Sequence, residues 1–388
     1  MLDWLVVGGG VHGTHISHVL TQQLGVPRHR LRVVDPHPTP LHLWAQRTAT
    51  VGMRFMRSPM VHHLDVHPFS LKHFASSAPI ADWARFAYPF KRPSLTLFNA
   101  HSQRVVEAFD LDALRLTAAV TDVTTTDGGY LVETTQGQLA TRRVVLAVGM
   151  GGLRYPNWAQ QDAVSDRVAH IFDASFQREA IAPSDRVVVV GGGISAAQVA
   201  MACGKTTSQP VTLLQRHAPR IHQFDSDPGW MGPRHLTAFH QTPCTCTRRA
   251  MIAEARHAGS IPPQVHRDLK RAVRAQRVDV VQSMVTSAAV DVGGAVCFTL
   301  GDGSCLTADR VLLATGFATE RPGGAWMERM VQRLGLRCAQ CGFPIVTPDL
   351  AWRPGLHVTG ALAELEVGPV ARNIVGARLA ADRLLAAA

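Results

Sequence analysis

The sequence is short of aromatic residues, long apolar runs and basic clusters, and each shortage excludes a class of protein. Aromatic residues make up 6% of the 388 positions, so stacking on nucleic acid bases is poorly provided for. The net charge of +10 comes from scattered residues, and we expect it to attract anionic cofactors rather than nucleic acid. No apolar stretch reaches the roughly 18 residues of a membrane-spanning helix. The N-terminus also lacks the basic region of a signal peptide. We expect a cytoplasmic protein whose partners are small molecules.

The seven cysteines are an odd number, which does not suggest a disulfide framework. We expect reduced thiols. Cys338 and Cys341 have the spacing of a redox pair, but they follow both glycine loops described below, and we interpret them as incidental loop residues. Cys244 and Cys246 receive the same interpretation. A zinc site would require these four cysteines to converge, which the sequence does not show.

Two glycine-rich loops lie about 180 residues apart. Each follows an apolar β-branched run and leads into a predicted helix. The first has Gly8, Gly10 and Gly13 at the places of a G-x-G-x-x-G/A pattern, and the second has Gly191, Gly193 and Ala196. In this pattern the first glycine makes the turn, the second lets the backbone approach a pyrophosphate, and the third keeps helix and strand close. The two loops predict two dinucleotide sites.

The residues that follow each loop predict two different dinucleotides. A short strand at 31–35 ends in Asp35, an acceptor suited to ribose hydroxyls. The corresponding strand, which starts at Val211, ends in a base, and an Arg at this place, Arg216, suits a 2′-phosphate. We therefore expect FAD at the first loop and NADPH at the second.

The remaining chain divides around these two units. Residues 40–100 are irregular, and such a long insertion is expected to serve a function. A meander over 118–134 and a buried strand ending at Gly149 complete the first unit. A helix near 263–276, a strand at 278–285 and a hairpin around Gly303 belong to the second. A helix at about 369–387 is expected to return to the first unit, with its N-terminus near Val370 directed at the flavin.

Several motifs together resemble the two-dinucleotide-binding flavoprotein superfamily over nearly the whole chain. They are the two glycine loops, Val148-Gly149, Leu313-Ala314-Thr315-Gly316 and Val358-Thr359-Gly360. The Leu-Ala-Thr-Gly-Phe run ending at Phe317 is most similar to class B flavin monooxygenases and to their branch of lysine and ornithine N-hydroxylases. Residues 56–71 are similar to the segment that these enzymes place over the flavin face. Residues 224–228 are similar to an element of their nicotinamide domain.

The chain also departs from the family pattern, and it is shorter than the well-known N-hydroxylases. The FxGxxxH signature of flavin monooxygenases is missing, because Val164 and Asp166 occupy the Phe and Gly places before His170. Ala361 stands directly after the last Thr-Gly, where many flavoproteins carry an acid. Glu364, Glu366 or backbone N–H groups are expected to replace that acid.

The resemblance implies an α/β fold of two Rossmann-like three-layer domains, with the NADPH domain inserted in the FAD domain. Residues 1–150 and 317–388 would form the FAD domain, with 40–100 as an active-site insertion, and 151–316 the NADPH domain. The implied enzyme is an NADPH-reduced monooxygenase that uses FAD and O₂. It would hydroxylate a small nitrogen- or sulfur-containing substrate through a C4a-hydroperoxyflavin. The candidate catalytic residues are Met56, Arg57, Ser58, His62, His63 and Asp65. The expected cofactor-binding residues are Gly8, Gly10, His12, Gly13, Asp35, Val120, Gly149, Gly191, Gly193, Ser195, Ala196, Arg216, Thr315, Gly316, Gly360, Ala361 and Val370.

Two other functions and one other kind of site stay open at this stage. The enzyme could pass electrons from NADPH to a disulfide or quinone, or the chain could bind flavin without turnover. The series His12, His15 and His18 on the first helix would face a domain interface or a packed loop. Zinc is an alternative for this series and for the histidines at 62, 63 and 67, but we expect no metal. A homo-oligomer is also left open.

Overall fold

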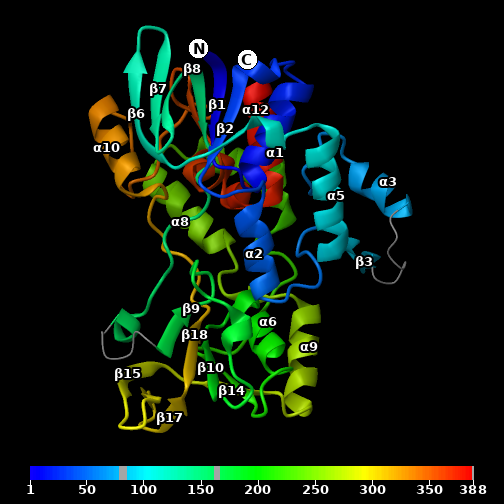
Figure 1. Cartoon of the computed structure of the whole chain (residues 1–388), viewed down its shortest axis with the longest axis vertical. Coiled ribbons are helices and arrows are strands. Elements are labelled where there is room, and N and C mark those ends of the chain that lie inside the picture. The colour runs from blue at the N-terminus through cyan, green and yellow to red at the C-terminus, as the bar shows by residue number, and fades with distance from the viewer. Residues whose placement is uncertain (78–84, 161–166, 387–388) are drawn as a thin grey trace.

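The structure, a computed structural model, describes residues 1–77, 85–160 and 167–386. Figure 1 shows an elongated molecule with one parallel sheet toward each end of its long axis. The N- and C-termini lie together at one end, above the first sheet. Both ends of the chain therefore contribute to the same half of the molecule.

The first sheet is built from strands at both ends of the sequence. Its order is β19-β20-β8-β1-β2-β5, and β7 and β6 add an antiparallel meander beside β8. The strands β20, β8, β1, β2 and β5 run parallel to one another. Their bounds are β1 Leu2–Val7, β2 Leu31–Asp35, β5 Arg115–Thr117, β6 Val120–Thr126, β7 Gly129–Thr134, β8 Gly137–Leu146, β19 Ala351–Arg353 and β20 Leu356–Val358.

The second sheet has five parallel strands in the order β14-β11-β10-β18-β9. A separate three-stranded antiparallel sheet, β15-β16-β17, lies beyond it (Figure 1). The bounds are β9 Val168–His170, β10 Val187–Val190, β11 Val211–Gln215, β14 Val278–Gln282, β15 Val285–Val290, β16 Val296–Leu300, β17 Cys305–Ala308 and β18 Arg310–Leu313. Two short pairs, β3 Phe86–Ala87 with β4 Arg92–Pro93 and β12 Arg220–Ile221 with β13 Ser260–Ile261, lie outside these sheets.

Helices cover the sheets, which explains why the central strands are apolar on both faces. Helices α1 and α12 pack together beside the first sheet, and α6 and α9 pack together beside the second (Figure 1). The bounds are α1 Val11–Gln22, α2 His42–Thr50, α3 Ser70–Ser77, α5 Leu95–Ala108, α6 Ile194–Cys203, α7 Pro233–Gln241, α8 Thr245–Ala255, α9 Pro263–Arg274, α10 Gly324–Leu334, α11 Glu364–Val367 and α12 Ile374–Ala386. None of the described helices has the length and apolar character needed to cross a membrane.

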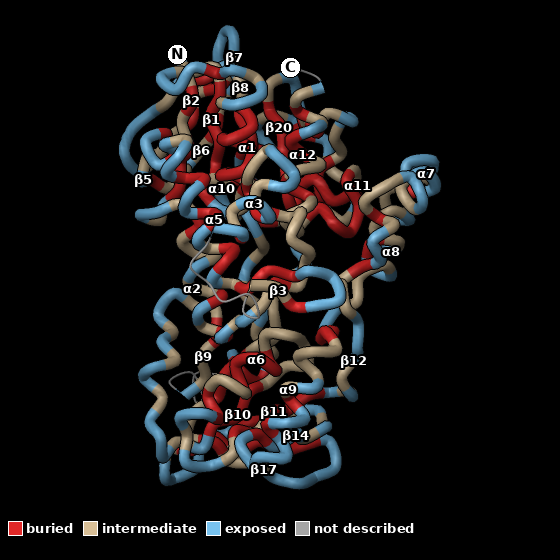
Figure 2. The backbone as a smooth tube through the Cα atoms, turned by 90° about the vertical axis from the view of Figure 1, so that its right-hand side faces the viewer, coloured by how far each residue is buried: buried red, intermediate tan, exposed pale blue. Residues whose placement is uncertain are grey.

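Each sheet has its own buried core, and Figure 2 shows buried backbone around β1 and α12 in one half and around β10 and α6 in the other. Helices α7 and α8 do not pack where their position in the sequence would suggest. They follow strands of the second sheet in sequence, yet Trp230, Phe239 and Ile252 are buried in the same cluster as β1 and β8. The segment that carries α7 and α8 therefore connects the two halves.

Most of the predicted elements are present, and two differ. The meander, the helix at 263–274 and the hairpin β16–β17 are confirmed. The insertion 40–100 is less irregular than predicted, since it contains α2, α3 and the start of α5. The C-terminal helix begins at Ile374, because Pro369–Arg372 forms a short 3₁₀ turn behind Gly368 (φ +83°).

Candidate functional site

The first glycine loop joins β1 to the N-terminus of α1. Gly8 has φ +109°, and a Cβ there would lie 2.3 Å from the Ala147 carbonyl oxygen. A Cβ on Gly13 would lie 1.7 Å from the Gly8 oxygen, so β1 and α1 pack too closely for any side chain. A Cβ on Gly10 would meet nothing within 4 Å. The protein backbone thus fills the space beside the first and third glycines, whereas the space beside the second is empty. A pyrophosphate could approach the helix N-terminus through that space.

Asp35 stands at the carboxyl end of β2, beside this loop, and is 9% exposed. Its Oδ2 accepts a hydrogen bond from the Gly9 N–H at 2.6 Å, and its Oδ1 accepts one from the His37 N–H at 2.8 Å. A carboxylate has about four acceptor positions, so both oxygens retain capacity for ribose hydroxyls. Asp35 therefore lies beside the first loop with acceptor capacity left, and its contact with a dinucleotide stays a prediction.

The chain's last segment closes over the first loop. His12, inside the loop pattern, lies 2.8 Å from Thr359 Oγ1 through Nδ1 and 3.1 Å from the Asn373 carbonyl oxygen through Nε2. Burial lowers the pKa of His12 to about 4, so the ring is neutral. Since a carbonyl only accepts, Nε2–H donates to Asn373 and Nδ1 accepts from Thr359. His12 thus fastens the start of the chain to its end.

Of the other predicted residues of the closing segment, Gly360 lies beside His12. Gly360 has φ +66°, and a Cβ on it would lie 3.7 Å from His12 Nδ1. Ala361 and Val370 are buried, at 2% and 3% exposure. The α-helical N-terminus expected near Val370 is instead at Ile374, next to Asn373.

Glu364 and Glu366 are the expected substitutes for an acid after Thr359-Gly360. Both side chains instead form ion pairs with arginines. Glu364 is fully buried and forms ion pairs with Arg249, Arg256 and Arg372. Glu366 forms ion pairs with Arg248 at 3.2 Å and Arg383 at 3.0 Å. Because Arg248, Arg249 and Arg256 belong to α8 and its C-cap, these carboxylates tie α8 to the C-terminal segment. Backbone N–H groups, the third expected replacement for the acid, stay a prediction.

The second glycine loop joins β10 to α6. A Cβ on Gly191 would lie 2.5 Å from the Ala314 oxygen, which repeats the tight turn of the first loop. A Cβ on Gly193 would be 3.5 Å from Gly259 Cα, an ordinary contact, so this position is open as Gly10 is. Ala196 is fully buried at the third place, and Ser195 lies in the first turn of α6. The spacing that predicts a dinucleotide loop thus gives the same geometry twice.

The residues after β11 surround the second loop. Arg216 is exposed directly after the strand end, and its neighbour His217 lies 3.4 Å through Cε1 from a Cβ built on Gly192. Gly259, from the segment after α8, approaches the same loop. His217 and Gly259 are not among the predicted site residues, although the run Arg216-His217 shows in the sequence that two basic residues follow β11.

Two crossovers connect the sheets near these loops. Thr315 Oγ1 donates to the Arg154 carbonyl oxygen, and the Arg154 N–H donates to the Gly316 oxygen at 3.0 Å. His170 Nε2 lies 3.1 Å from the same Gly316 oxygen. Gly149 and Gly316 have φ of +77° and +81°, a conformation that favours glycine. Val120 begins β6, whereas Val164 and Asp166 fall outside the described residues.

The candidate catalytic segment begins as a bridge between the two halves. Met56 is 2% exposed, and its carbonyl oxygen accepts from Arg92 Nη1 at 3.0 Å. The Arg57 guanidinium donates to the backbone oxygens of His222, Gln223 and Phe224 and to Ser260 Oγ, at 2.8–3.0 Å. Arg57 therefore holds together segments that are over 160 residues apart. Ser58 and His62 make no side-chain hydrogen bond within the described chain, and both are half-buried.

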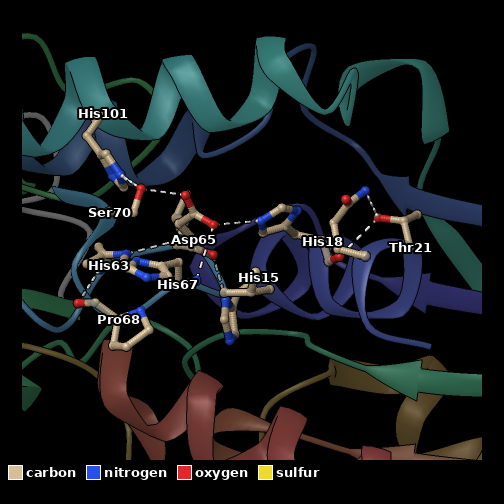
Figure 3. Close-up of polar contacts among 12 residues, drawn as sticks. His15, His18, Thr21, His63, Asp65, His67, Pro68, Ser70 and His101 are labelled. Atoms are coloured by element: carbon tan, nitrogen blue, oxygen red, sulfur yellow. Dashed lines mark hydrogen bonds and ion pairs between the residues drawn. The ribbon is translucent and has the colours of Figure 1, made fainter. Parts of the chain in front are cut away.

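The second part of this segment lies among buried histidines. Figure 3 shows Asp65 between His18 on one side and Ser70 and His101 on the other. His18 Nε2–H donates to Asp65 Oδ1 at 3.2 Å, Ser70 Oγ–H donates to Oδ2, and His101 Nε2 lies 2.8 Å from Ser70 Oγ. Burial opposes ionisation of Asp65, but the hydrogen bonds from His18 and Ser70 prevail and lower its pKa. The Asp65 carboxylate therefore joins His18 to Ser70 by accepting a hydrogen bond from each.

The same helices hold the backbone of residues 63–66. His15 Nδ1–H donates to the Leu64 oxygen at 2.7 Å, and Arg378 of α12 donates to the oxygens of Asp65 and Val66. His63 Nε2–H donates to the Pro68 oxygen at 3.1 Å (Figure 3). His15 and His18 thus face a packed loop, as one interpretation predicted, whereas His12 contacts Thr359 and Asn373. Among the described residues no group of three or more His, Cys, Asp or Glu is arranged to hold a metal ion.

Burial sets the ionisation of these histidines. It lowers the pKa of His15 to about 3 and the pKa values of His62, His63 and His101 to about 4. All four rings are neutral at physiological pH. His15, His63 and His101 act as hydrogen-bond donors and acceptors and not as cations.

The seven cysteines are free thiols. Cys338 and Cys341 are half-buried on the loop after α10, and the Arg321 guanidinium contacts Cys338 Sγ at 3.0 Å. Cys246 Sγ–H donates to Gln340 Oε1 at 3.3 Å, which places α8 beside this loop.

Two family models match the chain. Residues 5–151 match a model described as FAD-NAD(P)-binding, and residues 80–254 match one described as pyridine nucleotide-disulphide oxidoreductase. No curated protein sequence matches.

Solved structures with the same fold cover nearly the whole chain. The FAD-bound cadaverine monooxygenase of desferrioxamine biosynthesis from Erwinia amylovora is 17% identical, with a TM-score of 0.76 over 99% of this chain and 94% of its own. The ornithine N-hydroxylase of Kutzneria sp. is 15% identical, with a TM-score of 0.76 over 100% and 98%. The bacillithiol disulfide reductase of Bacillus cereus is 18% identical, with a TM-score of 0.60 over 100% and 98%.

These matches confirm the expected fold class and the expected use of FAD and NAD(P) by an oxidoreductase. Two parallel sheets, each with a glycine loop at the carboxyl end of a central strand, account for the match in structural terms. The chain has the fold of the two-dinucleotide-binding flavoproteins, to which its motifs pointed.

Proposed function

We propose that this protein is an FAD-dependent, NADPH-reduced monooxygenase that oxygenates a small nitrogen- or sulfur-containing substrate. The observation that carries the proposal is the pairing of two glycine loops with unlike neighbours, Asp35 at the first and Arg216 at the second. The fold likeness to N-hydroxylating enzymes over essentially the whole chain supports the reaction class. We also propose that residues 1–150 and 317–388 hold FAD and that 151–316 hold NADPH.

The first site would suit a permanently bound flavin. The N-terminus of α1 would face the pyrophosphate across Gly10, and Asp35 would accept from ribose hydroxyls. The His12 contacts to Thr359 and Asn373 would close the site from the C-terminal side. When bound, FAD supplies hydride acceptance and O₂ activation.

The second site is suited to a dinucleotide that exchanges. The exposed guanidinium of Arg216 would bind the 2′-phosphate that distinguishes NADPH from NADH. His217 lies beside the loop that would hold the pyrophosphate.

The segment from Met56 to Asp65 would form a wall of the reaction site. Arg57 fastens this wall to residues 222–224, which would hold the two cofactor regions in register and exclude water. Ser58 and the neutral His62 have side chains free to hydrogen-bond with the substrate or with the oxygen being transferred. His63 and Asp65 are bound within the fold and would position this wall.

The test is a stepwise reduction and reoxidation of the purified protein. We expect a yellow flavin spectrum, bleaching by NADPH without oxygen, and, on admission of air, a transient absorbance band distinct from those of reduced and oxidised flavin. Substrate should shorten the life of this band and yield a product heavier by one oxygen atom. Reoxidation with no transient band would contradict the monooxygenase.

A second function is electron transfer from NADPH to a disulfide or quinone. It is favoured by the family model matched over 80–254 and by the fold of the bacillithiol disulfide reductase. It predicts NADPH-dependent reduction of a disulfide or quinone without oxygen, and loss of disulfide turnover when Cys338 or Cys341 is replaced by Ser. A flavin that NADPH does not bleach would contradict both enzymes and leave a non-catalytic flavin-binding protein.

A further inference from the structure

Arg115 places a buried guanidinium beside the first glycine loop. The residue begins β5, which pairs in parallel with β2 so that Val33 lies opposite Arg115 and Asp35 opposite Thr117. Its side chain is 5% exposed. The Nη2 donates to the His37 carbonyl oxygen, and Nε lies 3.3 Å from Asp112 Oδ1. The Nη1 is buried and has no hydrogen-bond partner in the part of the chain that the structure describes.

The unpartnered nitrogen lies at the place where the loop meets Asp35. A Cβ built on Gly9 would lie 2.8 Å from Arg115 Nη1 and 3.2 Å from Asp35 Cβ. The Gly9 N–H also donates to the Asp35 carboxylate. Glycine at position 9 therefore leaves room for a cationic donor and an anionic acceptor side by side, at the end of the strand where a dinucleotide ribose is expected.

This pairing is complementary to a sugar hydroxyl. A hydroxyl group donates one hydrogen bond and accepts others, so one hydroxyl can donate to a carboxylate while it accepts from a guanidinium. A buried cationic N–H without an acceptor is costly, and Asp112 is too exposed, at 64%, to compensate for it strongly.

We propose that Arg115 is a further ligand of the first dinucleotide, and that its Nη1 donates to a ribose hydroxyl of the adenosine half that Asp35 holds from the other side. The proposal rests on the assignment of FAD to the first loop. It does not depend on the monooxygenase reaction, because it concerns binding and not turnover.

The test compares Arg115→Met with a control, Arg32→Met, on the neighbouring strand β2, where Arg32 donates to the backbone oxygens of Arg28 and Leu31. Apoprotein is titrated with FAD and with FAD whose adenosine ribose lacks both hydroxyls, and flavin fluorescence is recorded. We expect Arg115→Met to weaken FAD binding by about 10- to 100-fold, as for loss of a hydrogen bond to a charged group. Arg32→Met should bind FAD as the parent does, and the dideoxy analogue should bind equally to parent and Arg115→Met.

Unchanged FAD affinity in Arg115→Met would overturn the proposal. An equal loss for FAD and the dideoxy analogue would also overturn it, because the contact would then be elsewhere or the loss indirect. Arg115→Lys keeps the charge and serves if the Met variant does not fold; it should lose affinity for FAD but not for the analogue. If the parent itself does not bind FAD, the assignment of the first loop fails together with this inference.

Discussion

The two glycine loops have nearly the same backbone and very different surroundings. The first is fastened by His12 to Thr359 and Asn373, and its acid, Asp35, is buried. The second has an exposed Arg216 and lies against Gly259, on a segment that also connects to α8. We propose that similar loops serve a retained dinucleotide and an exchanging one because of what packs around them. The difference lies in tertiary contacts and not in the glycine pattern.

The largest effect is expected at the third position of the loops, which is Gly13 in one and Ala196 in the other. Gly13→Ala would place a Cβ 1.7 Å from the Gly8 oxygen, so α1 must move away from β1. We expect a loss of more than about 3 kcal/mol of unfolding free energy, read from thermal or urea unfolding. Ala196→Gly, the reverse change in the second loop, should cost only about 1 kcal/mol. Equal stability of the two variants would contradict this asymmetry.

Low pH is also expected to lower the stability of the protein strongly. The half of the molecule that contains the first sheet should lose stability first. Burial holds the pKa values of His12, His63 and His101 near 4 and that of His15 near 3, against about 6.5 when unfolded. The unfolded chain then binds more protons below about pH 6.5, so stability falls as pH drops from there toward 4. Between pH 6 and 5 each histidine should remove about 1 kcal/mol.

Urea unfolding at pH 7, 6 and 5 measures this slope, and hydrogen exchange at pH 5 locates it. Amides of the first sheet should lose protection before those of the second. His15→Asn keeps a donor for the Leu64 oxygen and should lower the proton uptake on unfolding by about one. If stability did not change with pH over this range, the pKa values of these buried histidines could not be lowered in the folded state.

A medium effect is expected at the second glycine of each loop, where the variants should fold. Neither Gly10 nor Gly193 has a close neighbour in the space that a Cβ would enter. Gly10→Ala should weaken FAD binding by about 100-fold, or about 2.7 kcal/mol, and leave NADP⁺ binding unchanged. Gly193→Ala should do the reverse. Calorimetric titration of both variants with both ligands checks this; a variant that loses both ligands would show that the two sites are not separate.

The smallest effect is expected at Arg216. Arg216→Ala should raise the KM for NADPH by about 10- to 30-fold and leave that for NADH nearly unchanged, because an exposed phosphate contact contributes about 1.5–2 kcal/mol. Steady-state flavin reduction with each nucleotide provides the measurement, and Arg220→Ala, a nearby exposed arginine, is the control. An equal effect on both nucleotides would remove the NADPH assignment.

The loops, their strands and Asp35 could be predicted because they depend on local spacing. The packing of Phe239 and Ile252 into the first core could not, since chain order places them within the second unit. The domain boundaries drawn from the sequence stay a prediction. The contacts of Arg57 and Arg115 could not be predicted either, because their partners are distant residues brought close by the fold.

The histidines show a further limit. His63 and Asp65 are candidate catalytic residues by resemblance, yet their contacts are with Pro68, His18 and Ser70. The chemistry of a side chain predicts which interactions it can make. The fold determines which neighbours it contacts. Their assignment to catalysis stays a prediction that only variants in the assembled protein can test.

The contacts of His12 with Thr359 and Asn373 also set an order of assembly. They join positions separated by 347 and 361 residues, and β20 cannot join β8 until the last part of the chain exists. During synthesis the second sheet, complete by Leu313, can form while the first still lacks strands. The site that we propose for the flavin would therefore be completed last, after the sheet in the middle of the chain has formed.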